Sequence, residues 1–284
     1  MQLTGKTLVL GIFGDPVQHS LSPRMQNAAI QAGNLDAVYV PFRVTKAQLC
    51  DALSGVRAMG MCGVNLTIPH KEAACDLVDE LDEHALLTGA VNTIVNTNGR
   101  LKGYNTDGHG LLKALKQELD VEIAGRRVML LGAGGACRAA IVALCQSGAT
   151  WIGLANRTRE RSQSLITDLA KHFKGTTFAE FPLAASLLDV CPEPVDLLVN
   201  TSAVGLKGEA FDFLVTGCVR PGGSVYDMVY ATGPTPLVEE ARRAGLAVAD
   251  GLGMLAGQGE IAFELWFGIA PKADIMRLAL ELGS

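Results

Sequence analysis

One short run in the first half of the chain combines polar side chains with a turn-forming proline. Residues 63–71 read Gly-Val-Asn-Leu-Thr-Ile-Pro-His-Lys. Alternation along a strand places Asn65 and Thr67 on the same face. Pro69 is expected to open a helix with Lys71 in its first turn, where the helix dipole disfavours a positive charge. This placement would adapt the Lys71 amine for proton transfer, and a plain surface lysine is the alternative interpretation.

A second polar cluster, Asn-Thr-Asp-Gly at residues 105–108, lies between a predicted hairpin and a predicted helix. Asp107 is a candidate for acid–base chemistry, and a simple helix N-cap is the alternative. Asn92 stands at the start of a predicted strand. Ser20 and Ser22 place two hydroxyls beside the start of a helix, a favourable position for a carboxylate ligand, although Ser22 also fits an N-cap.

A glycine loop marks the second half of the chain. Residues 130–136 read Leu-Leu-Gly-Ala-Gly-Gly-Ala, between a predicted strand and a predicted helix. Such a loop lets a pyrophosphate approach the helix N-terminus, where free N–H groups point outward. Cys137 stands where the strict dinucleotide pattern has a third small residue, so a tight turn between strand and helix is the alternative.

The strand after this loop ends in basic residues rather than an acidic one. It runs into Asn156-Arg157-Thr158, with Arg159 and Arg161 close behind. NAD sites place Asp or Glu here for the ribose hydroxyl, whereas a guanidinium pairs with a 2′-phosphate. The pattern therefore favours NADP over NAD, and a solvated basic helix start is the alternative.

Hydrophobic periodicity, interrupted by Gly and Pro, indicates the elements that position these side chains. The first half predicts strands at 7–13, 38–44, 62–68, 91–96 and 100–104, and helices at 22–32, 46–59, 69–78 and 80–87. Asn98-Gly99 indicates a type I′ hairpin turn between the last two strands.

The second half alternates strands with helices, which predicts a parallel sheet covered on both faces. A helix at 107–119 precedes strands at 128–131, 151–155, 195–200, 224–229 and 246–249, with helices at 139–146, 159–172, 254–267 and 272–281. The domain boundaries near 107 and 250 carry no distinct linker. The fold class is therefore α/β.

Composition narrows the class of protein. The chain has 284 residues, 49 % hydrophobic and 19 % charged, which excludes a disordered chain. A formal charge of −5 with no basic run argues against a nucleic-acid binder. The seven cysteines form no Cys-x-x-Cys pair and are read as reduced thiols, and the five dispersed histidines predict no metal site. We also expect no secretion signal and no membrane span.

Taken in order, the motifs resemble those of shikimate dehydrogenases. They are Ser-x-Ser-Pro at 20–23, the run at 63–71, Gly-Ala-Val-Asn-Thr at 89–93, Asn-Thr-Asp-Gly at 105–108, Gly-Ala-Gly-Gly-Ala at 132–136, Asn-Arg-Thr at 156–158, Asp-Met-Val-Tyr at 227–230 and Thr-Pro-Leu at 235–237. The resemblance covers essentially the whole chain, and several ordered motifs are more specific than any one.

The resemblance implies NADP-linked interconversion of 3-dehydroshikimate and shikimate, a step of aromatic amino-acid and chorismate biosynthesis. It implies two domains: an α/β substrate-binding domain with a mixed sheet from residues 1–107 and 251–284, and a Rossmann-like, doubly wound NADP-binding domain from residues 108–250. We expect a cytoplasmic oxidoreductase with a small-molecule substrate, either a monomer or a homodimer.

The resemblance also implies roles for individual residues. Lys71 and Asp107 would form the catalytic pair. The substrate would be bound by Ser20, Ser22, Thr67, Lys71, Asn92, Asp107, Tyr230 and Gln258. The cofactor would be bound by Glu83, Gly132, Ala133, Gly134, Gly135, Ala136, Asn156, Arg157, Thr158, Arg161, Met228 and Gly251, with the last two near the nicotinamide.

Two departures from the family pattern leave the substrate preference open. Residues 203–206 read Ala-Val-Gly-Leu where the family commonly has Pro-Leu-Gly-Met, and Gln258 is flanked by Gly257 and Gly259. A quinate/shikimate or aminoshikimate-type dehydrogenase of the same fold is one alternative. A methylene-tetrahydrofolate dehydrogenase is another, although it leaves the motifs at 20–23 and 105–108 unexplained. A non-catalytic NADP-binding regulatory module is the third, and it has less need of a proton-transfer pair.

Overall fold

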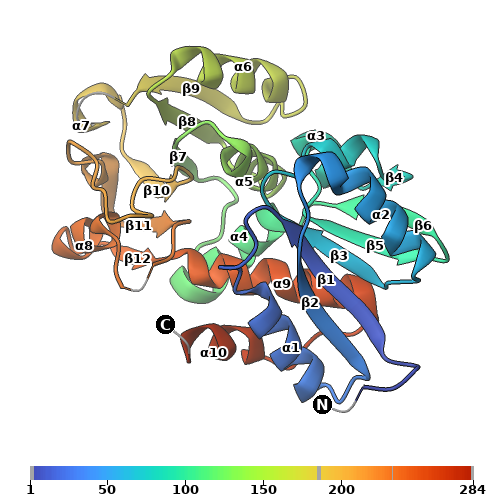
Figure 1. The fold of residues 1–284 in the computed structure, drawn as a ribbon. Coiled ribbons are helices and arrows are strands. Elements are labelled where there is room, and N and C mark those ends of the chain that lie inside the picture. The colour runs from blue at the N-terminus through green and yellow to red at the C-terminus, as the bar shows by residue number, and fades with distance from the viewer. Residues whose placement is uncertain (1–2, 184–186, 232, 283–284) are drawn as a thin grey trace. The chain divides into compact units, whose positions relative to one another are not determined.

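The structure is a computed structural model that describes residues 3–183, 187–231 and 233–282. The chain forms two compact units (Figure 1). Unit 1 comprises residues 1–110 and 255–284, and unit 2 comprises residues 111–254. Both boundaries fall inside helices, namely α4 (Asp107–Leu119) and α9 (Gly251–Phe267). We describe the predicted site residues for each unit separately.

Unit 1 is built on a mixed six-stranded sheet, sheet A, with the strand order β2-β1-β3-β5-β6-β4. The strands are β1 (Leu8–Gly14), β2 (Ala37–Arg43), β3 (Gly63–Leu66), β4 (Glu80–Leu81), β5 (Thr93–Thr97) and β6 (Arg100–Tyr104). β1 pairs in parallel with β2 and β3, whereas β5 runs antiparallel to β3 and β6. The mixed sheet expected for this part of the chain is confirmed.

Helices cover both faces of sheet A because its strands alternate their apolar side chains. They are α1 (Ser22–Ala32), α2 (Leu49–Ala58) preceded by a 3₁₀ turn at Lys46–Gln48, α3 (Glu83–Thr88) and α10 (Ile275–Glu281), together with residues 255–267 of α9. Phe13 and Val64 pack with α2. The opposite face meets α9, where Trp266 donates to the Ile94 carbonyl at 2.9 Å.

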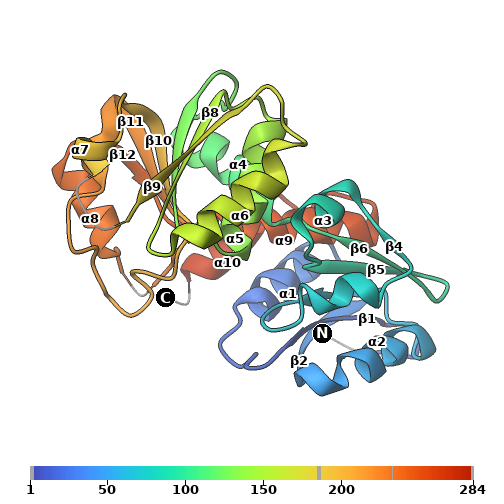
Figure 2. The same ribbon diagram turned by 90° about the horizontal axis from the view of Figure 1, so that it is seen from above.

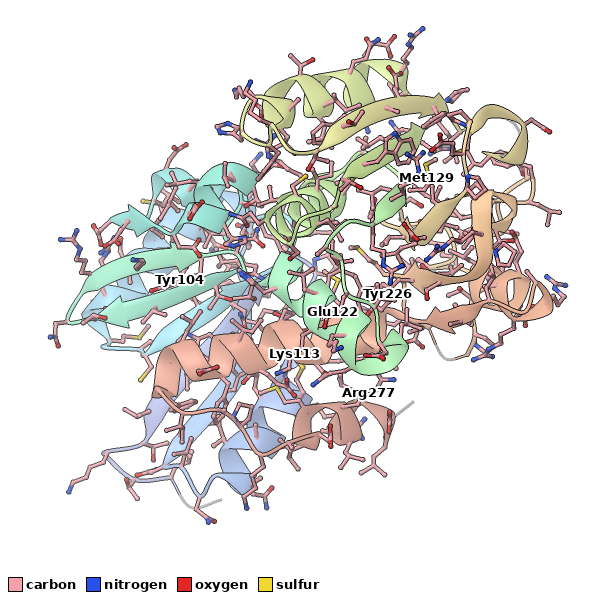
Figure 3. All side chains as sticks on the ribbon, turned by 180° about the vertical axis from the view of Figure 1, so that it is seen from behind. Tyr104, Lys113, Glu122, Met129, Tyr226 and Arg277 are labelled. Carbon is pink, nitrogen blue, oxygen red and sulfur yellow. The ribbon has the colours of Figure 1, made fainter. Side chains whose placement is uncertain are left out.

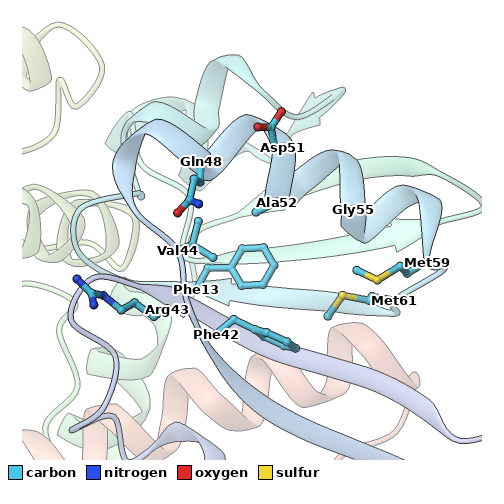
Figure 4. Close-up of a pocket in the computed structure, with 10 residues that line it drawn as sticks. All are labelled: Phe13, Phe42, Arg43, Val44, Gln48, Asp51, Ala52, Gly55, Met59 and Met61. Carbon is cyan, nitrogen blue, oxygen red and sulfur yellow. The ribbon is translucent and has the colours of Figure 1, made fainter.

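A groove lies between α2 and the edge strand β2 (Figure 4). It encloses about 410 Å³, and its apolar lining includes Phe13, Phe42 and Met61. Phe13 and Phe42 meet edge to face, with ring centroids 5.7 Å apart.

The open edge of β2 is covered by one side chain of α1. The Asn27 amide accepts from the Tyr39 backbone N–H at 3.0 Å and donates to the Tyr39 carbonyl at 2.8 Å. These two bonds have the pattern that a neighbouring strand would form. Pro41, two residues further along the same edge, has no N–H to offer.

The predicted helix at 69–78 is wrong. Its first residues form a turn, in which the His70 N–H donates to the Thr67 carbonyl at 2.9 Å, and only Ala73–Asp76 forms a 3₁₀ turn. A helix would use the Lys71 carbonyl for the N–H four residues on. Here that carbonyl accepts from the Val91 N–H at 2.8 Å, a contact that links distant parts of the chain.

The predicted helix at 80–87 is wrong at its beginning. Glu80 and Leu81 instead form β4 beside β6. The helix begins at Glu83, because the Asp82 carboxylate caps it by accepting from the Ala85 N–H at 2.7 Å. The hairpin prediction is confirmed, since Asn98 and Gly99 both have the positive φ angles, 53° and 88°, that a type I′ turn needs.

Unit 2 is built on a parallel sheet, sheet B, with the order β12-β11-β10-β7-β8-β9 (Figure 2). The strands are β7 (Arg127–Leu131), β8 (Trp151–Asn156), β9 (Thr177–Pro182), β10 (Val195–Asn200), β11 (Val219–Asp227) and β12 (Ala247–Ala249). The helices are α5 (Gly135–Gln146), α6 (Arg159–Ala170), α7 (Leu187–Val190) and α8 (Pro236–Arg243), with a 3₁₀ turn at Thr216–Cys218. The sequence pattern indicates neither β9 nor α8.

The strand order of sheet B confirms the doubly wound fold. From β7 the chain moves outward to β8 and β9, then returns to the other side of β7 and continues through β10, β11 and β12. The order reverses between β7 and β10, which is where such sheets bind ligands, beyond the carboxyl ends of the strands. The core is apolar, and Met129 and Tyr226, both labelled in Figure 3, are fully buried.

All seven cysteines are free thiols. Burial raises the pKa of the Cys137 thiol to about 12, of the Cys145 thiol to about 11 and of the Cys218 thiol to about 12. A thiol that stays protonated is a poor nucleophile. These three cysteines therefore act as small apolar core residues.

The contact between β3 and α9 gives a test of the packing of unit 1. A Cβ at Gly63 would lie 2.1 Å from the Ile94 carbonyl oxygen and 2.4 Å from Trp266 Nε1. We expect Gly63→Ala to lower the free energy of unfolding by about 3 kcal/mol, because backbone and indole must separate. Gly175→Ala is the control, since nothing lies within 4 Å of its Cβ. Urea unfolding measures both, and equal stability of the two variants would contradict the packing.

Candidate active site

The Lys71–Asp107 pair stands in unit 1, as the sequence predicts. Lys71 Nζ donates to Asp107 Oδ2 at 2.6 Å. The Lys71 side chain is 32 % exposed and that of Asp107 is 17 % exposed, so the pair is shielded but open to a ligand. Asp107 is the first residue of α4, and Lys71 follows the turn after β3. The two groups lie close enough to exchange a proton.

Asn92 holds the second oxygen of the carboxylate. Its Nδ2 donates to Asp107 Oδ1 at 2.7 Å and to Thr106 Oγ1 at 3.0 Å. Its Oδ1 accepts from the Thr106 backbone N–H at 2.9 Å, which determines the orientation of the amide. The Asp107 carboxylate thus accepts hydrogen bonds from the side chains of Lys71 and Asn92, and Asp107 does not serve as a simple N-cap.

Lys71 is positioned by a turn and not by a helix. The 3₁₀ turn begins only at Ala73, so the expectation that a helix dipole acts on this amine is wrong. The Val91 N–H holds the Lys71 carbonyl, and the ring of the buried His70 lies 2.7 Å from the Val44 carbonyl. The main chain on both sides of the amine is therefore anchored.

Ser20 and Ser22 lie at the start of α1. The N-cap position belongs to Leu21 and not to Ser22, which is the first helical residue. The Ser22 N–H donates to Ser20 Oγ at 3.3 Å, so the Ser20 proton remains available to a ligand. Ser22 is only 7 % exposed. The capping interpretation of Ser22 is therefore wrong.

Two further predicted substrate residues lie in unit 1. The Gln258 carbonyl accepts from Thr106 Oγ1 at 3.2 Å, which ties α9 to the residue just before α4. The next residue is held as well, because Gln26 Nε2 donates to the Gly259 carbonyl at 2.9 Å. Thr67 is half-buried, and its hydroxyl makes no hydrogen bond within the part of the chain that the structure describes.

Three residues that the motifs did not single out as site residues join this cluster. Tyr39, Asn65 and Thr106 are each buried and bonded to the polar set. Strand alternation predicts that Asn65 and Thr67 lie on the same face, and this pattern could have identified Asn65 as a site residue. Tyr39 lies in a strand that reads as apolar, so its sequence context gives no such signal.

In unit 2 the glycine loop fits a phosphate-bearing cofactor. α5 begins after Gly134 with no side-chain cap and no acidic residue in its first turn. Space is open where a Cβ of Gly134 or Gly135 would lie. Gly132 has φ +104°, and its Cβ would lie 3.1 Å from Ser202 Cβ, so the loop passes closely beside the end of β10. Uncapped N–H groups beside open space suit a pyrophosphate.

The basic residues after β8 differ in their partners. Arg157 and Arg161 are exposed, and neither has an acidic partner among the described residues. Arg159 instead lies 3.2 Å from Glu180. Asn156 closes the loop by donating to the Thr158 carbonyl at 2.8 Å. Arg157 and Arg161 are therefore the guanidinium groups that remain available to a phosphate.

A third predicted group, Met228, Tyr230 and Gly251, is brought together in unit 2. A Cβ at Gly251 would lie 2.2 Å from the Met228 carbonyl oxygen and 3.3 Å from the Tyr230 ring. Tyr230 is 36 % exposed, and the partial burial of its phenol raises the pKa of that group. Asp227, which the motif contains but the site prediction omits, supports this segment: its carboxylate accepts from Thr235 Oγ1 at 2.5 Å and from the Val229 N–H at 3.0 Å.

The loop at residues 203–206, which departs from the family pattern, is held by hydrogen bonds from the side chains of the residues just before it. Asn200 Nδ2 donates to the Val204 carbonyl at 3.0 Å, and Ser202 Oγ donates to Asn200 Oδ1 at 2.7 Å. Asn200 also donates to the buried Asp227 at 2.8 Å. The loop keeps a defined shape without a proline.

The remaining predictions concern Glu83, metals and membranes. Glu83 is exposed at the start of α3 and so belongs to unit 1, whereas the other predicted cofactor residues belong to unit 2. The described residues contain no group of three or more His, Cys, Asp or Glu side chains that could hold a metal. Within the same ranges, no helix is long and apolar enough to cross a membrane.

Three family descriptions match this chain. They are the shikimate dehydrogenase substrate binding domain at residues 12–94, shikimate / quinate 5-dehydrogenase at 113–191 and the shikimate 5′-dehydrogenase C-terminal domain at 251–281. The chain is 48 % identical to shikimate dehydrogenase (NADP(+)) of Geobacter sulfurreducens over 280 residues, covering 99 % of this chain and 98 % of the relative.

Solved structures agree with these matches. The shikimate 5-dehydrogenase of Thermus thermophilus, in complex with NADP(H) and shikimate, is 36 % identical with a TM-score of 0.85, covering 97 % of this chain and 99 % of that one. A ligand-free 5-ketofructose reductase of Gluconobacter is also similar, with 31 % identity, a TM-score of 0.90 and coverage of 98 % and 99 %. With its fold, its Lys71–Asp107 pair and its ordered motifs, the chain belongs to the shikimate dehydrogenase family.

Proposed function

We propose that the chain catalyses the reversible NADPH-linked reduction of 3-dehydroshikimate to shikimate. The observation that carries the proposal is the 2.6 Å contact between Lys71 Nζ and Asp107 Oδ2 in a partly shielded site. Oxidation of a secondary alcohol needs a group that takes the hydroxyl proton. Because Lys71 and Asp107 share a hydrogen bond, a proton taken up by one can be held by both.

The other residues of unit 1 bind and orient the substrate. Ser20 and Ser22 hold its carboxylate at the start of α1, where the free N–H groups of a helix favour an anion. Asn92 keeps the Asp107 carboxylate turned toward Lys71, while Thr67 and Gln258 contact ring hydroxyls. These roles are supported by burial, by the bonds described above and by the family's motifs.

Unit 2 supplies the cofactor groups. NADP(H), when bound, supplies or accepts the hydride. Residues 132–136 and the α5 N-terminus hold the pyrophosphate, whereas Arg157 and Arg161 hold the 2′-phosphate, with Asn156 and Thr158 shaping that loop. Met228 and Gly251 are assigned to the nicotinamide and Glu83 to the cofactor, whereas Tyr230 is assigned to the substrate.

The substrate panel tests the proposal as a whole. The rate is measured by the absorbance of NADPH. We expect the rate of NADP+ reduction with shikimate to exceed both the rate with quinate and the rate with NAD+ in place of NADP+. Quinate turnover comparable to shikimate would assign the chain to the quinate/shikimate class. 5-Ketofructose with NADPH is included as a further substrate, because one of the similar solved structures is a 5-ketofructose reductase. No turnover despite NADP+ binding would contradict a dehydrogenase and favour a regulatory module.

The acid–base pair gives a second test. We expect Lys71→Met and Asp107→Asn each to lower kcat with shikimate by roughly 10²–10⁴-fold, because each removes one partner of the proton transfer. Lys102→Met is the matched control, since Lys102 also pairs with a carboxylate, Glu80, but lies on the surface of unit 1. Near-normal turnover of Lys71→Met would contradict the assignment.

The arginines test the cofactor preference. We expect Arg157→Ala and Arg161→Ala each to lower kcat/KM for NADP+ relative to NAD+ by roughly 10–100-fold, because a charge-assisted bond to the 2′-phosphate is lost. Arg242→Ala serves as the control, being an exposed arginine of the same unit. The preference is measured with both cofactors at saturating shikimate, and an unchanged ratio in the first two variants would exclude the phosphate clamp.

A further inference from the structure

One buried carboxylate of unit 2 lies where three segments of the chain meet. Asp227 is the last residue of β11, which pairs in parallel with β10 (Figure 1). It is fully buried, and it accepts from Asn200 Nδ2 at 2.8 Å, from the Val229 N–H at 3.0 Å and from Thr235 Oγ1 at 2.5 Å. Asn200 ends β10, and Thr235 caps α8. The carboxylate therefore joins two strand ends to the start of a helix.

The orientation of the Asn200 amide is determined by its neighbours. Its Oδ1 lies 3.0 Å from the backbone nitrogen of Ser202, which can only donate, so the other end of the amide is Nδ2. Nδ2 donates to the Val204 carbonyl at 3.0 Å and to Asp227 Oδ1. The Val229 N–H also can only donate. Asp227 Oδ1 therefore carries no proton and serves as the acceptor for two fixed donors.

The same contacts enclose Met228, which the proposed function assigns to the nicotinamide. The Met228 N–H donates to the Asn200 carbonyl at 3.0 Å. On either side of it, Asp227 and Val229 are buried and joined by the hydrogen bond to Oδ1. The Val229 carbonyl accepts from the Gly251 N–H at 3.3 Å. The backbone at Met228 is therefore fixed, while Met228 itself remains partly exposed.

The glycine loop is held by other hydrogen bonds. Thr201 donates to the Leu131 carbonyl with its N–H at 2.9 Å and with its hydroxyl at 2.8 Å. Leu131 ends β7 and directly precedes the loop at residues 132–136. Neither bond involves Asp227. Loss of the Asp227 carboxylate should therefore affect the proposed nicotinamide contacts and spare those of the pyrophosphate.

We propose that Asp227 is a positioning residue whose buried Oδ1 holds Met228 in place beside Asn200 and thereby determines where the nicotinamide ring of NADP(H) lies on unit 2. The inference deepens the proposed function and rests on its cofactor assignment, because Met228 is given the nicotinamide there. Asp227 has no exposed surface, so it acts through Met228 and does not touch the cofactor. Its role is to accept hydrogen bonds, and that role does not require its negative charge.

The first test compares two ligands, of which only one contains nicotinamide. They are NADP+ and 2′-phospho-ADP-ribose, and titration calorimetry on the whole chain measures the Kd of each. We expect Asp227→Ala to raise the Kd of NADP+ about tenfold, because the donors of Asn200 and Val229 lose their acceptor and the Met228 backbone moves. The Kd of 2′-phospho-ADP-ribose should stay within about twofold. An unchanged Kd for NADP+, or an equal rise for both ligands, would overturn the inference.

A conservative variant separates hydrogen bonding from charge. Asp227→Asn keeps an oxygen for Asn200 and Val229, and its amide group can donate to the Thr235 hydroxyl, but the charge is removed. We expect the Kd of NADP+ to remain within about threefold of the wild-type value. A Kd as high as that of Asp227→Ala would show that the charge acts on the cofactor, and it would overturn the positioning role.

Asp196→Ala is the matched control at the other end of β10. The Asp196 carboxylate also belongs to unit 2 and also accepts from a backbone N–H, that of Arg127 at 2.7 Å. Its removal lowers the free energy of unfolding, which urea unfolding measures. The Kd of NADP+ should stay within about twofold, because Asp196 lies at the amino end of the strand and Asn200 at its carboxyl end. A rise equal to that of Asp227→Ala would assign the effect to lost stability and overturn the inference.

A pair of variants at Thr235 keeps the test decisive if Asp227→Ala fails to fold. Thr235→Val removes the hydroxyl that holds Asp227 Oδ2, whereas Thr235→Ser retains it. We expect Thr235→Val to raise the Kd of NADP+ about threefold and Thr235→Ser to leave it unchanged. Equal Kd values for these two variants would overturn the inference.

Turnover separates this inference from the proposed function. In Asp227→Ala we expect kcat with shikimate to fall about tenfold, because hydride transfer depends on where the nicotinamide lies. The KM for shikimate should stay within about threefold, since all its proposed binding residues except Tyr230 belong to unit 1. A wild type that binds NADP+ without turning over shikimate overturns the proposed reaction, and the Kd comparison still decides the inference. An active wild type beside an Asp227→Ala variant with unchanged constants overturns the inference alone.

Discussion

A buried amide has to place both its donors and its acceptors, and the candidate site depends on how Asn92 does so. The Thr106 backbone N–H donates to Asn92 Oδ1, and the Asn92 Nδ2 group at the other end of the amide therefore faces Asp107. One carboxylate oxygen is thereby taken, and the other remains for Lys71. An orphaned group at 3 % exposure would cost about 1–3 kcal/mol, so the fold itself enforces the orientation of the pair.

The two units hold their functional groups by different physical means. Unit 1 relies on side chains that bond to one another across β3, β5 and α4, so each group is positioned by its partners. Unit 2 relies mainly on main chain: a glycine loop, an uncapped helix and the reversal of strand order beside β7. The first arrangement suits a small ligand with several hydroxyls, and the second suits a phosphate-bearing ligand of standard shape.

Local signals predicted those parts of the fold whose cause is local. The helix at 107–119 and the hairpin at Asn98-Gly99 follow from periodicity and from residues that accept positive φ. The helix at 69–78 was wrong because the Lys71 carbonyl is taken by Val91, a partner that local pattern does not reveal.

The same distinction holds for the site. Lys71, Asn92 and Asp107 lie in recognisable motifs, whereas the polar role of Tyr39 depends on Asn65, which lies two strands away across β1. The proposed role of the arginines in binding NADP depends on which of them have acidic partners, and only the structure shows this. Arg159 looks identical to Arg157 in the sequence, yet only Arg159 is paired with Glu180.

The amide of Asn27 has a consequence beyond unit 1's own stability. An exposed edge strand is a template on which another chain can add a strand, the first step of edge-to-edge aggregation. At Tyr39 both backbone groups of that edge are already occupied, and at Pro41 the donor is missing from the sequence. A strand from another chain would have to displace Asn27 and would still lack a backbone N–H partner at Pro41, two residues later. Sheet A therefore ends at β2.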